Sequence, residues 1–202
     1  MSVDTYDNLK TEIANHLDRD DLTSDIDTFI DLAEARHKRE VRVRDMVNRD
    51  ALTVNARQVS LPTGFLEMIN LRLLTNPVTV LNEVGIYEMT RQRLETTGKP
   101  ILYTVYGNEI EFDRSPDSSY SGEIIYYKEL DALSDSNTSN AILSRAPDLY
   151  LYGALLAAEP FLLNDERVQT WTLFYRSALE AINEQDNRRA GPLVSRVTGA
   201  TP

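Results

Sequence analysis

The sequence predicts an α+β protein, in which a helical bundle formed by the two ends of the chain carries a central β-rich insertion. Apolar residues recur every three or four positions in both terminal regions, which is the spacing of amphipathic helices. Between these regions, residues 101–113 alternate apolar and polar side chains on both sides of Gly107-Asn108, a dipeptide typical of two-residue hairpin turns. We therefore expect antiparallel strands inserted in a mainly helical chain.

The N-terminal region predicts two helices. The first has the apolar stripe Tyr6, Leu9, Ile13 and Leu17, and it ends at the polar residues 18–21. The second is capped by Thr23 or Ser24, and we expect it to end near Met46. Its inner face consists of Ile26, Phe29, Ile30, Ala33 and Val41.

The central region predicts strands around one helix. Residues 53–81 contain strand-like segments that Pro62-Thr63-Gly64 and Asn76-Pro77 interrupt. Residues 82–97 have helical spacing and end at Gly98. The hairpin strands are 101–106 and 109–113, and a third strand covers 122–130. Alternation along this third strand places Ile124 and Tyr126 on one face and Ile125 and Tyr127 on the other.

The C-terminal region predicts an antiparallel pair of helices followed by an arm. Residues 148–163 are apolar on nearly all sides, so several neighbours must cover this helix, and Pro160 should kink or end it. Asn164-Asp165 caps the last helix. The seam of that helix is Val168, Trp171, Tyr175, Ala178 and Ile182. From Ala190 onward, glycine and proline exclude regular structure.

These patterns divide the chain into four parts. They are the N-terminal bundle helices (1–52), a β-rich insertion with one helix (53–133), a C-terminal helical hairpin (134–189) and an extended arm (190–202). The 202 residues are enough to bury a core. We see no secretory signal and no apolar stretch close to the ~20 residues of a membrane-spanning helix, so we expect no membrane partner.

Charge and composition exclude several functions. A formal net charge of −11 disfavours tight binding to nucleic acid, because phosphate neutralisation requires clustered lysine and arginine. The absence of cysteine excludes disulfides and thiolate metal sites. The chain contains no GxSxG, GxxxxGK[ST], HExxH or GxGxxG motif, so we expect neither an enzyme nor a cofactor.

Two groups of side chains have a chemical interpretation and a simpler one. His16 and Asp20 are spaced as a pair of metal ligands, but a solvated helix face explains them better. Glu109, Glu111 and Asp113 share one face of a strand and could serve a carbohydrate-active hydrolase as acid and base. Their alternation with apolar residues favours the solvated side of a half-buried strand.

The only dense basic run has two interpretations of equal weight. It consists of Arg36, His37, Lys38, Arg39, Arg42 and Arg44. The first interpretation is a solvated helix end, with Glu34–Lys38 and Glu40–Arg44 as ion pairs one turn apart. The second is an electrostatic contact with an acidic neighbouring subunit.

Short motifs occur in a fixed order along nearly the whole chain. The N-terminal ones are Tyr6-xx-Leu9-xxx-Ile13-Ala14-xx-Leu17-xx-Asp20-Asp21-Leu22, Phe29-Ile30-xx-Ala33-Glu34-Ala35-Arg36 and Arg42-Val43-Arg44-Asp45-Met46. The central ones are Leu61-Pro62-xx-Phe65-Leu66, Thr97-Gly98-Lys99-Pro100 with Tyr103, Gly107-Asn108-Glu109-Ile110 and Tyr126-Tyr127. The C-terminal ones are Leu133-Ser134-Asp135-Ser136-Asn137, Asp148-Leu149-Tyr150-Leu151-Tyr152-Gly153-Ala154-Leu155, and Asp165-Glu166 followed by Trp171 and Tyr175. In this order they resemble the phage head-to-tail connector adaptor proteins.

The resemblance implies a structural virion protein that is assembled in the host cytoplasm. Such adaptors form a ring, usually of twelve copies, beneath the portal protein. The ring carries the next tail or nozzle protein, and double-stranded DNA passes through its lumen without specific binding. The alternative within the virion is a tail completion or stopper protein, which would bind the end of the tail tube.

The resemblance also implies where contacts are made. The C-terminal extension of such adaptors commonly reaches the portal, which assigns portal binding to Arg188, Arg189, Leu193, Val194, Arg196 and Val197. The β-rich insertion would face the tail or the adjacent subunit. Together with the basic run, this gives the expected inter-subunit residues Arg36, Arg39, Arg42, Arg44, Glu109, Glu111 and Tyr126.

Overall fold

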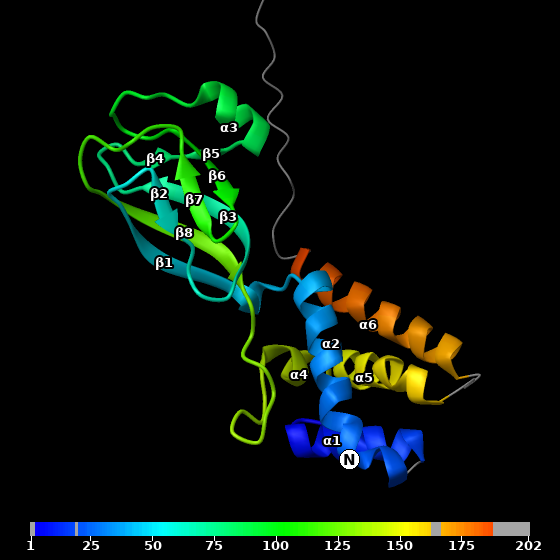
Figure 1. The fold of residues 1–202 in the computed structure, drawn as a ribbon. Coiled ribbons are helices and arrows are strands. Elements are labelled where there is room, and N and C mark those ends of the chain that lie inside the picture. Colours follow the sequence, from blue (N-terminus) through cyan, green and yellow to red (C-terminus); the bar gives the residue numbers. More distant parts are fainter. Residues whose placement is uncertain (1–2, 19, 163–166, 188–202) are drawn as a thin grey trace, which may run out of the picture. The chain divides into compact units, whose positions relative to one another are not determined.

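The computed structural model describes residues 3–18, 20–162 and 167–187, and it confirms the α+β class (Figure 1). The chain divides into two compact units. We call residues 1–45 together with 131–202 the helical unit, and residues 46–130 the β unit. Among the described residues, no helix is both long enough and apolar enough to cross a membrane.

The helical unit is a bundle organised around one helix, α5. Its elements are α1 (Tyr6–Leu17), the 3-10 helix η1 (Asp20–Asp25), α2 (Ile26–Glu40), α4 (Ala141–Arg145), α5 (Pro147–Leu162) and α6 (Val168–Asn187). As its composition predicts, α5 contacts α1, α2, α4 and α6. Its residues Leu149, Ala154, Leu155 and Ala158 are fully buried. Pro160 lies in the last turn, and its missing N–H removes one helical hydrogen bond two residues before α5 ends.

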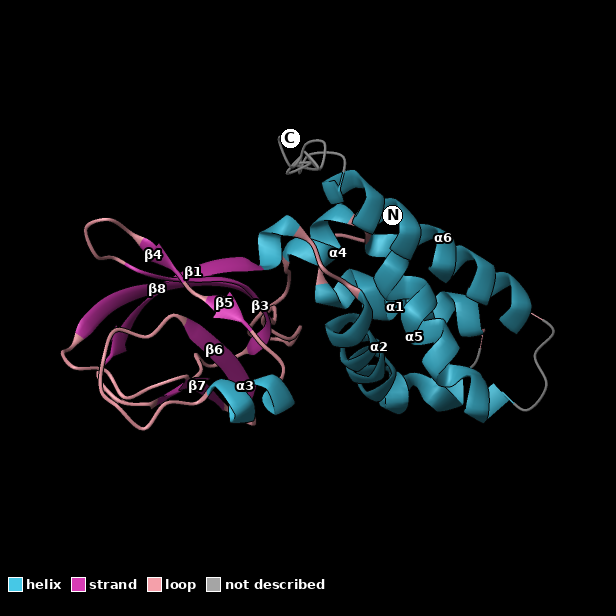
Figure 2. Cartoon of the chain, turned by 90° about the horizontal axis from the view of Figure 1, so that it is seen from above, coloured by secondary structure: helices cyan, strands magenta, loops and turns pink. Residues whose placement is uncertain are grey.

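The β unit contains two four-stranded sheets around one apolar core (Figure 2). Its elements are η2 (Arg44–Met46, which begins at the unit boundary), β1 (Val47–Val54), β2 (Gln58–Ser60), β3 (Phe65–Leu73), β4 (Thr79–Val80), β5 (Asn82–Glu83), α3 (Ile86–Gln92), β6 (Leu102–Tyr106), β7 (Glu109–Phe112) and β8 (Tyr120–Lys128). One sheet has the order β1-β8-β3-β4 and the other β2-β7-β6-β5. The core takes side chains such as Leu71 and Ile124 from the first sheet and Ile110 and Phe112 from the second.

The predicted hairpin and the predicted third strand are confirmed. Tyr106 pairs with Glu109 across the two-residue turn, where Gly107 has a φ of +60° that a glycine adopts without strain. In β8, Ile124 and Tyr126 are buried, whereas Ile125 and Tyr127 are partly exposed. The alternation in the sequence therefore identified the inner face correctly.

The predicted end of the second helix is wrong. α2 ends at Glu40, because Val41 is extended, with φ −97° and ψ 129°. Val41 and Val43 then bury their side chains completely, while Arg42 between them is half-buried. This alternation shows that the chain has left the helix several residues before Met46.

The predicted helix over residues 82–97 is also mostly wrong. Only α3, residues 86–92, is helical, and the residues before it form β5, parallel to β6. The N–H groups of Leu94 and Gly98 donate to the carbonyls of Asp113 and Ser115, respectively. These hydrogen bonds hold the segment after α3 against the chain that follows β7, so it cannot continue as a helix.

β1 begins six residues earlier than the sequence pattern indicates. Its inner face carries the polar residues Asn48 and Asp50, so the sequence lacks the alternation of apolar and polar residues that is typical of a strand. Both bind the Tyr126 hydroxyl: Asn48 Nδ2 donates to it at 3.1 Å, and it donates to Asp50 Oδ2 at 2.7 Å. The strand forms here because its polar inner residues have partners on β8.

Candidate interaction surfaces

The three carboxylates near the hairpin do not form a catalytic pair. Glu109 is exposed, and Glu111 lies 3.4 Å from the Arg93 guanidinium. Asp113 was predicted on the solvated face, and this is wrong, because only 1% of the residue is exposed. Its Oδ1 accepts the N–H groups of Ile101 and Leu102 at 3.0 and 3.2 Å. Its Oδ2 also pairs with the Arg114 guanidinium at 2.7 Å, so Asp113 anchors the start of β6.

The spacing that suggested a metal site at His16 and Asp20 is not realised on a helix. α1 ends at Leu17, and Asp18 follows in the left-handed conformation with φ +50°. His16 Nδ1 lies 2.8 Å from the carbonyl oxygen of Glu12, within its own helix. Within the described part of the chain, no three histidine, aspartate or glutamate side chains are grouped to hold a metal ion.

The basic run at the end of α2 is partly buried and partly exposed. Lys38 and Arg39 are exposed on the last turn, and Arg44 is exposed in η2. Arg36 lies over the Tyr175 ring, 5.3 Å from its centroid, in a hollow of about 400 Å³ between α2, α5 and α6. The Arg42 guanidinium donates to the carbonyls of Lys38 and Val41.

Two glutamates of α2, Glu34 and Glu40, bind tyrosines of the bundle. Glu34 is buried, and its Oε1 accepts the Leu133 N–H at 2.8 Å and the Tyr150 hydroxyl at 3.0 Å. Burial raises the pKa of Glu34, which these two hydrogen bonds oppose. Glu40 Oε2 accepts the Tyr175 hydroxyl at 2.8 Å. α2 ends at Glu40, so Glu40 and Arg44 are not one turn apart on a helix, contrary to what the sequence pattern predicts.

His37, which belongs to the same run in the sequence, lies inside the bundle. It is 3% exposed, its ring meets the Tyr150 ring edge-on at 4.7 Å, and burial lowers its pKa to about 4. The helical spacing of Phe29, Ile30, Ala33 and His37 places all four on the inner face of α2. Extending the apolar stripe by one turn would therefore have identified His37 as a core residue.

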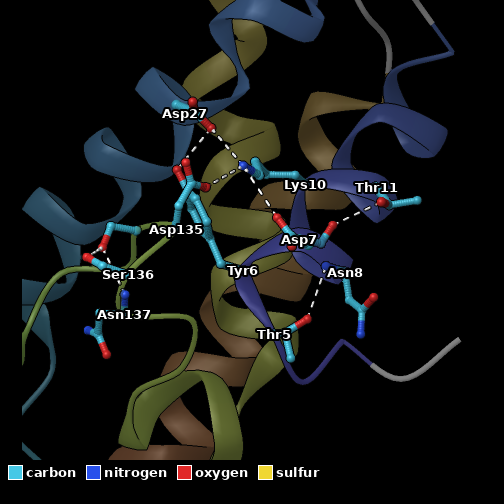
Figure 3. A network of polar contacts seen from close by, with 11 residues as sticks. Thr5, Tyr6, Asp7, Asn8, Lys10, Thr11, Asp27, Asp135, Ser136 and Asn137 are labelled. Atoms are coloured by element: carbon cyan, nitrogen blue, oxygen red, sulfur yellow. Dashed lines mark hydrogen bonds and ion pairs between the residues drawn. The ribbon is translucent and has the colours of Figure 1, made fainter.

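A cluster of charges joins α1, α2 and the segment after the β unit, and the sequence reasoning missed it (Figure 3). Lys10 Nζ lies 3.2 Å from Asp135, 3.6 Å from Asp7 and 3.8 Å from Asp27. It also lies 4.2 Å from the centroid of the Tyr6 ring, and the Tyr6 hydroxyl donates to Asp27 at 2.9 Å. The three carboxylate side chains remain between 63% and 87% exposed. Three carboxylates around one ammonium leave this exposed surface negative.

The motif around Asp135 has a structural explanation. The backbones of Ser134 and Asn137 exchange hydrogen bonds of 3.0 and 3.1 Å, which closes a tight turn. Leu133 is buried, and its N–H donates to Glu34 as described. The turn presents Asp135 to Lys10. Leu133 therefore serves the packing of the bundle, and Asp135 belongs to the charge cluster.

The β unit exposes several large apolar side chains. Leu74, Val78 and Val80 are each at least 50% exposed; Val80 lies on β4, and Leu74 and Val78 lie in the connection between β3 and β4. Further exposed apolar residues of this unit are Val47, Ile69, Ile86, Tyr87, Leu94, Ile101 and Tyr106.

The residues predicted to bind the portal or a neighbouring subunit fall into three groups: outside the described residues, exposed and buried. The portal-binding residues Arg188, Arg189, Leu193, Val194, Arg196 and Val197 lie outside the described residues. The Asn164-Asp165 cap also lies outside them. Of the inter-subunit residues, Arg39, Arg44 and Glu109 are exposed, whereas Tyr126 is 1% exposed and belongs to the core of the β unit.

Comparison with known proteins supports the resemblance seen in the motifs. The family model described as SU10 adaptor protein matches residues 4–196, which include the whole β unit and most of the helical unit. No match is found among curated proteins. The match covers nearly the whole chain and confirms the resemblance to phage head-to-tail adaptors: this chain belongs to the SU10 adaptor protein family, a family of phage structural proteins.

Proposed function

We propose that the protein forms an adaptor ring of about twelve copies, which docks beneath the portal and carries the next tail component. The observation that carries this proposal is the family match over residues 4–196. The exposed apolar residues of the β unit support it, because a component held between two others needs surfaces for several partners. The competing hydrolase is less well supported, since Asp113, one of its three carboxylates, is occupied with holding β6 in place.

The C-terminal arm is the proposed portal-binding segment. Residues 188–202 contain three arginines and no acidic residue, although the whole chain has a net charge of −11. Ordering an arm costs roughly 1–2 kcal/mol per residue, and burial of Leu193, Val194 and Val197 returns about 1.5–3 kcal/mol each. Docking therefore also needs main-chain pairing and arginine contacts. The simultaneous binding of many arms in a ring would strengthen it further.

Truncation of the arm tests this assignment. A chain lacking residues 190–202 should keep the circular dichroism spectrum of the full chain but no longer sediment with rings of its portal protein. A chain lacking only residues 199–202 keeps every proposed portal-binding residue and is the matched control. Unchanged sedimentation of the longer truncation would refute the assignment, and binding to isolated tail tubes instead would favour the stopper protein.

We propose that DNA crosses the ring without specific binding. Twelve copies with a formal charge of −11 each would carry −132, and an acidic lumen would repel phosphates and keep DNA mobile. Assembled rings should therefore not retard duplex DNA in a gel at physiological ionic strength. A ring whose lumen proves basic by electron microscopy would contradict this proposal.

A further inference from the structure

The charges of the helical unit are separated along the chain. Residues 1–31 contain nine acidic and two basic residues, whereas residues 36–44 contain five basic residues and one acidic residue. α2 joins the two regions, since it begins at Ile26 and ends at Glu40. The N-terminal end of this helix is therefore strongly acidic and its C-terminal end is basic.

The two ends are too far apart to neutralise each other. Asp27 and Lys38 are separated by eleven residues of α2, which corresponds to about 16 Å along the helix axis. This exceeds the screening length of about 8 Å at physiological ionic strength. Both charged ends lie at the surface of the helical unit, where Asp27, Lys38 and Arg39 are exposed.

The acidic end offers a shaped surface. Asp7, Asp27 and Asp135 surround Lys10, as described above, and their exposed oxygens face solvent. A hollow of about 390 Å³ lies beside them between α1 and α2. It is lined by Lys10, Thr11, Ala14, Asn15, Ile26 and Asp27. Such a hollow accepts a long basic side chain, whose methylene groups pack on apolar atoms while its charged end reaches the carboxylates.

The basic end offers side chains of the matching kind. Lys38 and Arg39 are exposed on the last turn of α2. The only acidic residue in this run, Glu40, accepts a hydrogen bond from Tyr175 and is directed toward α6. Leu32, 50% exposed on the same helix, supplies apolar surface between the two ends.

We infer that the basic end of α2 in one copy binds the acidic surface around Lys10 in the next copy. Lys38 and Arg39 contact Asp7, Asp27 and Asp135 of the neighbouring copy. The two surfaces are different patches of the same chain, so the contact is head-to-tail and repeats from copy to copy, as ring closure requires. Single exposed ion pairs are weak, so the contact depends on several pairs acting together. This inference rests on the proposed ring.

Crosslinking provides the first test, because the chain contains no cysteine. A chain with Arg39→Cys and Asp135→Cys, bound to its portal rings and treated with a short bismaleimide, should give a ladder of multimers. Each single variant alone should give no crosslink. Dimers from Arg39→Cys alone would indicate a two-fold contact between α2 helices and would overturn the inference. The absence of any ladder from the double variant would also overturn it. A chain with Arg91→Cys and Asp135→Cys is the control, since Arg91 lies on α3.

Charge reversal provides the second test. The variant K38E/R39E and the variant D27K/D135K should each lower adaptor occupancy of portal rings at least about tenfold at limiting concentration. An equimolar mixture of the two should restore occupancy, because each then meets a neighbour of opposite charge. The variant R91E should behave as the unmodified chain. A mixture that fails to restore occupancy overturns the inference.

These tests separate the inference from the proposed function. If the charge-reversed chains assemble as the unmodified chain does, the head-to-tail contact is wrong while the adaptor function stands. If the unmodified chain never binds portal rings, the proposed function fails. If the unmodified chain binds DNA and K38E/R39E does not, the basic end binds nucleic acid, and the inference is overturned.

Discussion

At the scale of single residues, the buried polar groups have the clearest roles. Asp113 accepts two backbone N–H groups and pairs with Arg114, so its charge is needed where it is buried. Glu34 likewise satisfies a backbone N–H of the segment after the β unit and the Tyr150 hydroxyl. The sequence pattern predicts both residues as solvated charges. Both in fact hold together segments that hydrophobic packing alone does not fix.

Asp113→Ala should destabilise the β unit by about 2–4 kcal/mol, because it leaves two N–H groups and a guanidinium without their acceptor. Urea unfolding, followed by far-UV circular dichroism, measures this loss of stability. Glu109→Ala, on the exposed side of the same hairpin, is the control and should change stability by less than about 0.5 kcal/mol. Equal stability of the two variants would contradict the anchoring role.

His37 should make the helical unit less stable in mild acid. Burial lowers its pKa in the folded state to about 4 from an ordinary value of 6.5, so between these values the unfolded chain binds a proton that the folded chain does not. Stability contributed by neutral His37 is therefore present above about pH 6.5 and is lost as the pH falls toward 4. The loss amounts to at most about 3 kcal/mol.

The measurement is urea unfolding of the full chain and of His37→Gln between pH 7.5 and 4.5. The free energy of unfolding of the unmodified chain should fall more steeply than that of the variant. Glu34, whose pKa burial raises, acts in the opposite direction in both proteins and cancels in the comparison. Parallel curves would show that His37 titrates normally.

At the scale of elements, α5 packs closely against α2 at Gly153. Gly153 of α5 has no side chain where α2 approaches, and an added Cβ would lie 3.1 Å from Ala33 Cβ and 3.4 Å from His37 Nε2. The same Cβ would lie 3.4 Å from the ring of Tyr175, which its hydroxyl bond to Glu40 holds in place. The glycine thus sets how closely the two helices approach.

Gly153→Ala should lower the free energy of unfolding by about 1 kcal/mol, although alanine is the better helix former. The gain in helix propensity is about 0.5–1 kcal/mol, and overpacking costs about 1–3 kcal/mol. Thermal unfolding measures the net change. Gly85→Ala, where nothing lies within 4 Å of the added Cβ, is the matched control and should be neutral. A stabilised Gly153→Ala chain would show that α2 can move away.

At the scale of the whole molecule, the β unit is an insertion with its own core. The chain enters it through β1 and leaves it through β8, and Val47 pairs with Tyr127 at that end of the sheet. Paired residues of antiparallel strands have Cα atoms about 5 Å apart, so the chain leaves the unit close to where it enters. An insertion with adjacent ends need not disturb the host unit when it is removed.

Replacing residues 46–130 by a short Gly-Ser linker should therefore leave a folded helical unit. We expect a higher helical fraction in circular dichroism and one cooperative thermal transition. The isolated segment 46–130 should fold separately, with a β spectrum. A molten helical fragment without a cooperative transition would show that the helical unit needs the β unit to fold.

The sequence alone determined the α+β class, α1, the hairpin turn and the apolar helix α5. These features follow from the periodicity, composition or turn residues of a short stretch of chain. Tertiary structure decided where α2 ends, why α3 is short, that Asp113 and Glu34 face inward, and that Lys10 gathers three carboxylates. Each of these depends on partners distant in the sequence, such as Leu133 for Glu34 and Asp135 for Lys10. A hydrogen bond or ion pair between distant segments leaves no period in the chain, so only the folded arrangement reveals it.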